Sequence, residues 1–167
     1  GGSKKTTFEP ISVTELIQNV KPLVNPSNDV SFCVDVSEII EDDVMILANQ
    51  ILLEQMLLNL SLNSVDALQN TIDPQIIFKV YSIGVSKVVI EVIDNGVGIS
   101  DLDKKQLFDP FFTTKDSGTG LGLSIVFQII SDHQGRINVL DNDPTGTIIR
   151  IELPQLLRPK IIEGQHV

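Results

Sequence analysis

The sequence predicts an α+β fold in which helices pack on a sheet as a two-layer sandwich. Helical and strand patterns do not alternate along the chain, as they would in a doubly wound parallel sheet. Instead, Gln75–Ser82 and Lys87–Asp94 read as strands that follow each other through Gly84, most simply as a hairpin. The stretch Asn49–Leu68 is apolar around most of its girth, which is typical of a helix inside a core. At 167 residues, the chain is long enough to form one domain around such a core.

The first third of the chain contains signals for one helix and two strands. Ser12 and Glu15 have the spacing of a capping box, and apolar residues follow at helical intervals, so we expect a helix over Val13–Leu23. The alternation of apolar and polar residues in Val30–Val36 predicts a strand. A short second strand is expected over Asp43–Ala48, directly before the central helix.

The central helix, with Asn49 as its expected N-cap, combines apolar residues with a polar ridge. Its apolar positions are Ile51, Leu52, Met56, Leu57, Leu60, Val65 and Leu68. Asn59, Asn63 and Asp66 are separated by four and three residues, which stacks them on one ridge. Burying amides and a carboxylate costs free energy unless something pairs with them. Groups of neighbouring strands could satisfy these side chains, or a ligand with a metal could, and the helix alone leaves both interpretations open.

The second half of the chain contains two helices and a final pair of strands. Ser100 and Asp103 have the spacing of a helix start, and a Pro-Thr-Gly sequence marks a late turn. The expected order is a short helix from Ser100 toward Leu107, an irregular segment Asp109–Gly120, a helix Leu121–His133, a strand Arg136–Leu140, a turn Asp143–Gly146 and a strand Thr147–Leu153.

Charge and composition exclude several classes of function. The formal net charge of −10 would repel nucleic acid and anionic membrane surfaces. Cys33 is the only cysteine, so an intramolecular disulfide and a CxxC zinc pair are both impossible. No apolar run approaches the length of a membrane span. A phosphate-bearing ligand must therefore be held by backbone N–H groups, a metal and a few local cations.

Three loops after the central helix carry residues suited to such a ligand. Asp94–Ile99 ends a strand with a carboxylate that could accept a hydrogen bond from an amine such as that of adenine, although such a sequence is more often only a turn. Phe108–Lys115 is either a small aromatic core cluster or a lid whose lysine reaches a terminal phosphate. Gly118–Ser124 leads into a helix, where consecutive backbone N–H groups form an anion site.

In this order and spacing, the motifs resemble the catalytic ATP-binding domain of sensor histidine kinases, within the GHKL superfamily. Asn59–Ala67 is similar to the N box, Asp94–Ile99 to the G1 box, Phe108–Lys115 to the F box and Gly118–Leu123 to the G2 box. Gly146 and Thr147 resemble the last nucleotide-contacting turn. The resemblance implies a GHKL-type two-layer sandwich, with a mixed, mostly antiparallel sheet covered on one face by helices.

The resemblance also implies a set of site residues for Mg²⁺ and the substrate ATP. Asn63 would coordinate Mg²⁺, Asn59 would assist it, Asp94 would hold the adenine amine and Lys115 would meet the γ-phosphate, which makes Asn59 and Lys115 the catalytic residues. The implied ATP contacts are Asn59, Asn63, Asp66, Asp94, Gly96, Gly98, Ile99, Thr114, Lys115, Gly118, Thr119, Gly120, Leu121, Gly122, Leu123 and Thr147. Ser64 stands where the family usually has Ala, a difference expected to change little.

The resemblance favours phosphotransfer to a histidine over hydrolysis. Superfamily members that hydrolyse ATP place a glutamate at the position of Asn59, and an amide cannot act as that general base. Glu54 lies too far around the helix to replace it, and a solvated or capping role is expected. Neither His133 nor His166 has the sequence context of a phosphoacceptor, and a structural role at a helix end, aided by the helix dipole when protonated, is expected for His133.

The leading hypothesis is therefore an ATP:protein-histidine phosphotransferase domain whose phosphoacceptor histidine lies on a separate domain. The alternatives are a nucleotide-sensing or interaction module without catalysis, and a serine kinase of the anti-sigma-factor type. The expected partners are ATP, a helical dimerisation and phosphoacceptor domain of the same kinase and, indirectly, a response regulator, without nucleic acid or direct membrane contact.

The expected organisation places one catalytic domain between two short ends. Residues 1–7 are expected to be a tag remnant and linker, residues 8–154 the ATP-binding domain, and residues 155–167 a C-terminal tail. We expect the isolated domain to be monomeric and cytoplasmic, even if its parent protein is anchored to a membrane.

Overall fold

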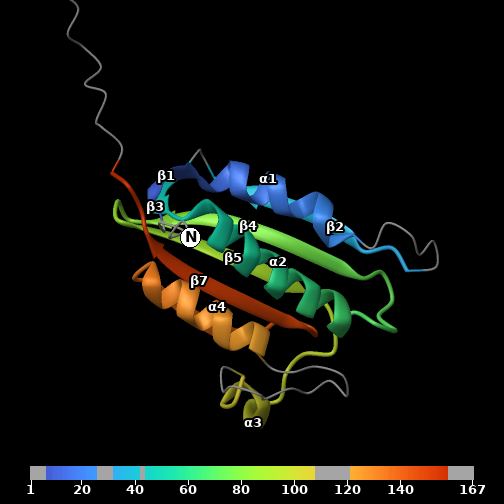
Figure 1. Cartoon of the computed structure of the whole chain (residues 1–167). Coiled ribbons are helices and arrows are strands. Elements are labelled where there is room, and N and C mark those ends of the chain that lie inside the picture. The colour runs from blue at the N-terminus through green and yellow to red at the C-terminus, as the bar shows by residue number, and fades with distance from the viewer. Residues whose placement is uncertain (1–6, 26–31, 42–43, 108–120, 158–167) are drawn as a thin grey trace, which may run out of the picture.

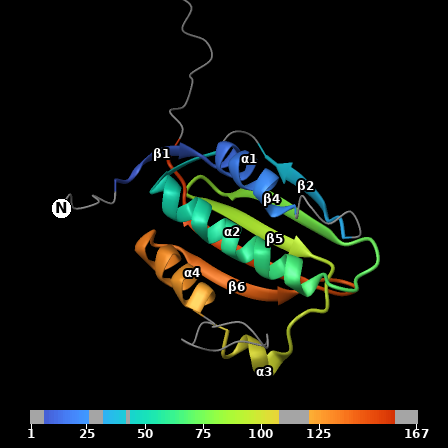
Figure 2. The same cartoon turned by 45° about the vertical axis from the view of Figure 1, so that its right-hand side comes forward.

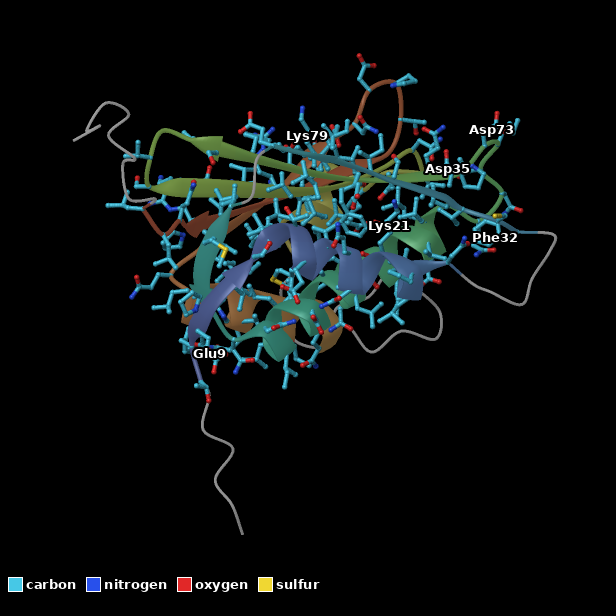
Figure 3. All side chains as sticks on the ribbon, turned by 90° about the horizontal axis from the view of Figure 1, so that it is seen from above. Glu9, Lys21, Phe32, Asp35, Asp73 and Lys79 are labelled. Atoms are coloured by element: carbon cyan, nitrogen blue, oxygen red, sulfur yellow. The ribbon has the colours of Figure 1, made fainter. Side chains whose placement is uncertain are left out.

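The computed structural model describes residues 7–25, 32–41, 44–107 and 121–157. The elements are β1 (Glu9–Ser12), α1 (Val13–Val24), β2 (Asp35–Ile40), β3 (Met45–Ala48), α2 (Gln50–Ala67), β4 (Gln75–Ile83), β5 (Lys87–Asp94), α3 (Asp101–Lys104), α4 (Leu121–Asp132), β6 (Arg136–Asp141) and β7 (Thr147–Pro154). Helices α1, α2 and α4 lie side by side on the sheet (Figures 1 and 2), and Figure 3 shows all three on one of its faces. The two-layer α+β sandwich predicted from the sequence is confirmed.

The main sheet has five strands in the order β2-β4-β5-β7-β6. β2 runs parallel to β4, whereas the other neighbouring pairs are antiparallel. β4 and β5 pair from Ile76 opposite Asp94 to Ile83 opposite Lys87, which confirms the predicted hairpin. β5 is thus a central strand, and its last residue, Asp94, also pairs with Thr147 at the start of β7.

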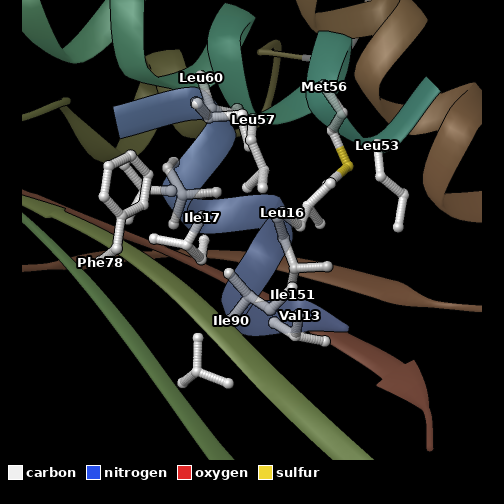
Figure 4. Close-up of a cluster of buried hydrophobic side chains, with 14 of the residues drawn as sticks. Val13, Leu16, Ile17, Leu53, Met56, Leu57, Leu60, Phe78, Ile90 and Ile151 are labelled. Carbon is white, nitrogen blue, oxygen red and sulfur yellow. The ribbon is translucent and has the colours of Figure 1, made fainter. Parts of the chain in front are cut away.

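The core lies between the helices and the covered face of the sheet. Figure 4 shows Leu16 and Ile17 of α1 meeting Met56 and Leu57 of α2 above Ile90 of β5. All five side chains are almost completely buried. Burial of an aliphatic side chain contributes about 1.5–3 kcal/mol, so this cluster holds α2 firmly against the sheet.

Both predicted helix caps are present. The Ser12 hydroxyl accepts a hydrogen bond from the Glu15 backbone N–H at 3.2 Å. Asn49 Oδ1 accepts one from the Leu52 N–H at 3.1 Å. Each cap satisfies an N–H group that has no partner within its helix. The observed bounds of α1 and α2 agree with the predicted bounds to within about one or two residues, which is the usual uncertainty of helix ends.

The structure differs from the sequence predictions in three places. The strand predicted over Val30–Val36 lies further along as β2, because pairing begins where the Asp35 N–H donates to Pro74 O; residues 30 and 31 lie outside the described residues. β1 was not expected, and it forms only through its antiparallel pairing with β3. Ile51, counted among the core-facing residues of the central helix, is 77% exposed because it begins the helix beyond the edge of the core.

Within the described residues, no helix is both long enough and apolar enough to cross a membrane.

Candidate nucleotide-binding site

A pocket that is partly open to solvent lies between α2, the end of β5 and strands β6 and β7. The described residues that line it are Leu60, Asn63, Ser64, Ala67, Asp94, Ile99, Leu107, Leu123, Ile137, Val139, Thr147 and Ile149. Most are apolar, and the few polar groups come from the last turns of α2 and from the facing strand ends. A largely apolar cavity with a few convergent polar groups is the usual form of a site for a small organic ligand.

Asp94 is the buried charge of this pocket, with 3% of its surface exposed. Its Oδ1 accepts hydrogen bonds from the backbone N–H groups of Gly96 at 2.9 Å and Thr147 at 3.3 Å. Burial raises the pKa of Asp94 above its ordinary value, while the hydrogen bonds from Gly96, Ser64 and Thr147 act in the opposite direction. Asp94 is therefore a buried carboxylate held in one orientation, able to accept a hydrogen bond from a ligand.

The loop after Asp94 is packed against the end of α2. The Val97 N–H donates to Ala67 O at 3.2 Å. A Cβ atom added at Gly96 would lie 2.5 Å from the same carbonyl oxygen. The absence of a side chain at Gly96 therefore allows the loop to approach α2 closely. Gly98 has a φ of +78°, a left-handed conformation that favours glycine.

The turn between β6 and β7 is tied to the same loop. Asn142 Nδ2 donates to Asp94 O at 2.8 Å, and the Thr145 hydroxyl donates to Gly96 O at 2.8 Å. Gly146 has a φ of +112°, and a Cβ added there would lie 2.0 Å from Asp94 O. These contacts fix the backbone that carries Asp94.

The polar ridge of α2 enters the pocket through one residue. Asn63 is half-buried and lines the cavity together with Asp94. Asn59 is half-buried and Asp66 is exposed, and neither is among the lining residues. The ridge thus runs from the pocket outward to the surface, as its spacing predicted, and Asn63 is its contribution to the cavity.

The side chains at the Asn63 end of the pocket suit a Mg²⁺ ion that is held mainly by a bound small molecule. Among the described residues, no group of three or more His, Cys, Asp or Glu side chains could hold a metal. An amide oxygen such as that of Asn63 is a hard ligand, and Mg²⁺ commonly takes one or two protein oxygens together with phosphate oxygens and water. The residues present therefore fit a metal that arrives with a triphosphate.

Several predicted contacts cannot be located. Thr114, Lys115, Gly118, Thr119 and Gly120 lie outside the described residues. Leu121 and Gly122 begin α4, and nothing is described of their side chains. Of the remaining expected contacts, Asn63, Asp94, Ile99, Leu123 and Thr147 line the pocket, whereas Gly96 and Gly98 support it from the loop.

Sequence reasoning missed much of the wall and the supports of Asp94. The missed lining residues are Leu60, Ser64, Ala67, Leu107, Ile137, Val139 and Ile149. Ile137 and Val139 lie two residues apart on β6, so their spacing could have placed both on one face of the strand. Asn142 and Thr145 stood in an expected turn, but no local signal showed which loop that turn would contact.

His133 and Glu54 both make structural contacts. His133 Nε2 accepts a hydrogen bond from the Asn49 N–H at 3.1 Å, and its Nδ1 lies 2.7 Å from Ile129 O. Both ring nitrogens thus contact backbone groups, one at the start of α2 and one in α4. Glu54 Oε1 accepts from Asn19 at 3.0 Å and from Gln50 at 3.0 Å, which links α1 to α2.

Comparison of the sequence with known proteins finds a matching family and similar relatives. The profile of the family described as histidine kinase-, DNA gyrase B- and HSP90-like ATPases matches residues 48–157. The signal transduction histidine-protein kinase AtoS of Escherichia coli is 34% identical over 151 residues, which are 90% of this chain but 24% of AtoS. The chain thus spans about a quarter of the length of that curated relative.

Solved structures of histidine kinase ThkA are also similar. Its catalytic domain, in a nucleotide-free form, is 30% identical with a TM-score of 0.74, covering 89% of this chain and 95% of that one. ThkA in complex with the response regulator protein TrrA is 27% identical with a TM-score of 0.73, covering 89% of this chain and 42% of that one.

Proposed function

The chain belongs to the family of histidine kinase-, DNA gyrase B- and HSP90-like ATPases, and from that premise we propose that it is the Mg-ATP-binding catalytic domain of a sensor histidine kinase. It donates the γ-phosphoryl group of ATP to a histidine on a separate helical dimerisation domain. The observation that carries the proposal is the buried, oriented carboxylate of Asp94 at one end of an apolar pocket, with Asn63 in the same cavity.

The apolar wall and Asp94 bind the adenine. Ile137, Val139 and Ile149 offer flat apolar contacts to a planar base. Asp94 accepts a hydrogen bond from the exocyclic amine of adenine, because its carboxylate lies in the pocket and its backbone is fixed by Asn142. A base with an oxygen at this position would bring its lone pairs toward a carboxylate, so recognition of adenine follows from charge as well as shape.

The other end of the pocket binds the phosphates. Asn63 holds Mg²⁺ through its side-chain oxygen, and Asn59 assists one turn earlier on α2. When bound, Mg²⁺ neutralises the charge that develops on the phosphate oxygens during transfer. Lys115 and the backbone N–H groups of Gly118, Gly120 and Gly122 hold the terminal phosphates. Thr114, Thr119, Leu121 and Leu123 complete the ATP contacts, whereas the exposed Asp66 is a peripheral member of the set.

Two features favour transfer to another domain over hydrolysis. An amide at position 59 cannot remove a proton from an attacking water. His133 is 6% exposed, and both of its ring nitrogens are engaged with backbone groups, so it is not available as an acceptor. The acceptor histidine therefore belongs to a further part of the parent kinase. By analogy with the ThkA complex, a response regulator is the downstream partner.

Two other functions would use the same pocket. A nucleotide-sensing module without catalysis would bind Mg-ATP and transfer nothing, and a serine kinase of the anti-sigma-factor type would label a serine. The relatives and solved structures reported above are histidine kinases, which favours the histidine acceptor.

Phosphotransfer from γ-labelled ATP distinguishes these functions. The chain is incubated with labelled ATP and Mg²⁺, alone and with the separately prepared helical dimerisation domain of its parent kinase. We expect no label on the chain alone and acid-labile label on the added domain. Acid-stable label on a serine would support the serine kinase, and binding without any transfer would support the sensing module. Rapid phosphate release without transfer would place the protein with the hydrolysing members of the family.

A further inference from the structure

A short segment of the chain leaves the wall of the pocket and returns to it. Ile99 and Leu107 both line the pocket, and α3 lies between them in the sequence. Leu107 is 6% exposed, whereas no residue of α3 is buried. Figures 1 and 2 show α3 apart from the three helices that cover the sheet. The pocket wall therefore depends on a segment whose own helix has no buried residue.

Local interactions give α3 little stability of its own. The Ser100 hydroxyl accepts a hydrogen bond from the Asp103 N–H at 3.1 Å, and Ser100 O accepts one from the Lys104 N–H at 2.9 Å. An isolated helix shorter than about 12–15 residues is marginal in water, and α3 has four residues. A contact with the rest of the fold must therefore hold α3 in place.

Lys104 supplies such a contact. Its Nζ donates a hydrogen bond to Asp141 Oδ1 at 2.5 Å and lies 3.5 Å from Asp101 Oδ1 within α3. Among the described residues, the pair with Asp141 is the hydrogen bond that joins a side chain of α3 to the sheet. The Lys104 side chain is 18% exposed, so it lies against the fold and does not extend into solvent.

Asp141 places this ion pair beside the residues that support the pocket. It is the last residue of β6 and pairs in register with Thr147 of β7. Thr147 lines the pocket, and its N–H donates to Asp94 Oδ1 at 3.3 Å. Asn142, the next residue in the chain, donates to Asp94 O. Lys104 therefore anchors α3 to the same strand end that supports Asp94.

We propose that Lys104 is a positioning residue whose ion pair with Asp141 holds α3 at the edge of the sheet and so keeps Leu107 in the wall of the pocket. The inference rests on the proposed nucleotide-binding function and deepens it, because it assigns part of the affinity for the adenosine moiety of ATP to a contact outside the pocket. The Asp141 side chain is 70% exposed, so salt screens this contact. The affinity for adenosine therefore depends on an ion pair that touches no part of the ligand.

The first test measures the affinity of the full chain for adenosine, an uncharged ligand that carries no phosphate for Lys104 to attract. Lys104→Gln and Asp141→Asn should each weaken adenosine binding by about twofold to fivefold, the size of a partly exposed ion pair. The double variant should bind no more weakly than either single variant, because both substitutions remove the same contact. Added salt should weaken binding to the wild type toward that of the variants and should leave the variants unchanged.

Two further variants serve as controls. Lys105→Gln removes the same charge from the adjacent, exposed lysine and should retain the wild-type affinity for adenosine. Lys104→Arg keeps a cation that can reach Asp141 and should also retain it. A loss in Lys105→Gln equal to that in Lys104→Gln would show that charge alone, and not the contact with Asp141, is responsible.

A second measurement, with Mg-ATP, distinguishes the ion pair from long-range attraction of the phosphates. If the two side chains acted only through their charge, Lys104→Gln would weaken binding and Asp141→Asn would strengthen it. We expect both substitutions to weaken it. Effects of opposite sign, or wild-type affinity for adenosine in both variants, would overturn the role of Lys104.

A readout without ligand separates this inference from the proposed function. The methyl signals of Leu107, followed by NMR in 13C-labelled protein, should be broadened more by a neutral, soluble paramagnetic probe in Lys104→Gln and Asp141→Asn than in the wild type or Lys105→Gln. Unchanged broadening would overturn the inference, even in a chain that binds ATP. Stronger broadening in a chain that binds neither adenosine nor ATP would support the positioning of Leu107 by Lys104 and would reject the nucleotide function, and with it the effect on affinity.

Discussion

The two ends of the pocket are built differently. At the Asp94 end, the carboxylate is buried and its loop is fixed by Ala67, Asn142 and Thr145, which belong to two different parts of the chain. At the α2 ridge, Asn59 and Asn63 are half-buried and Asp66 is exposed, and all three side chains belong to one helix. The fold thus fixes the end at which we propose that the base binds, whereas the end proposed for the metal offers amides beside the cavity. A fixed site for the base suits the proposed role, in which the domain presents the γ-phosphate of bound ATP to another domain.

The first prediction tests whether the contact between the Asp94 loop and α2 fixes this end of the pocket. Gly96→Ala would place a Cβ atom 2.5 Å from Ala67 O, so loop or helix must move. We expect a loss of about 3 kcal/mol in the free energy of unfolding, near the upper range for overpacking, together with loss of ATP binding. Chemical denaturation measures the first effect and calorimetry the second.

Gly84→Ala is the matched control for that substitution. Gly84 lies in the β4–β5 turn with φ +62°, and a Cβ there would meet nothing within 4 Å. Only backbone strain of about 1–2 kcal/mol is expected, without an effect on ATP affinity. Equal effects of the two substitutions on ATP binding would show that the Asp94 loop is not specially fixed.

The second prediction concerns the carboxylate itself. Asp94→Asn keeps the shape and the acceptor for Gly96 and Thr147 but replaces a charged acceptor for the amine by an amide. We expect ATP affinity to fall by about 1–3 kcal/mol, the cost of a mismatched buried hydrogen bond. Competition against a fluorescent ATP analogue measures the loss. Wild-type affinity in this variant would remove Asp94 from base recognition.

The third prediction concerns the metal end. Asn63→Ala should abolish the dependence of triphosphate binding on Mg²⁺, because it removes the amide oxygen from the cavity, and should leave most of the fold intact. Binding is measured with and without Mg²⁺, and Gln55→Ala, on an exposed position of the same helix, is the control. A purely structural role would give the opposite pattern, with lost stability and an unchanged response to Mg²⁺.

The smallest expected effect is on stability without ligand. Burial raises the pKa of Asp94 in the folded protein, so this group stabilises the fold fully only below its ordinary pKa, and that contribution is lost as pH rises through the folded value. Asp94→Asn removes this dependence. At neutral pH the variant should therefore unfold at a slightly higher temperature than the wild type, and the difference should vanish in acid. A lower melting temperature at neutral pH would mean that the hydrogen bonds outweigh burial.

How far the sequence predicts the site also differs between its two ends. The period of one helix placed Asn63 on a polar ridge and Asp94 stood at the end of an apolar strand, and the family resemblance implied their roles. Asn142 and Thr145 were not, because they meet the Asp94 loop across 48 and 49 residues of sequence, and no local pattern encodes such a contact. The same limit explains β2, whose start is set by pairing with β4 and not by its own alternation.

Ser64 shows a different limit of sequence reasoning. Its departure from the usual alanine was visible, but only the structure shows that Ser64 lines the same pocket as Asp94. A residue inside a recognised motif can thus share a cavity with a residue that is 30 positions away in the sequence, Asp94.

The most direct test is a calorimetric titration of the wild-type chain with a non-hydrolysable ATP analogue, with and without Mg²⁺, and with the corresponding GTP analogue. We predict one site per chain, tighter binding of the ATP analogue with Mg²⁺ than without it, and much weaker binding of the GTP analogue under both conditions. Equal affinity for the two bases, or binding that ignores Mg²⁺, would contradict a pocket with Asp94 reading adenine at one end and Asn63 holding the metal at the other.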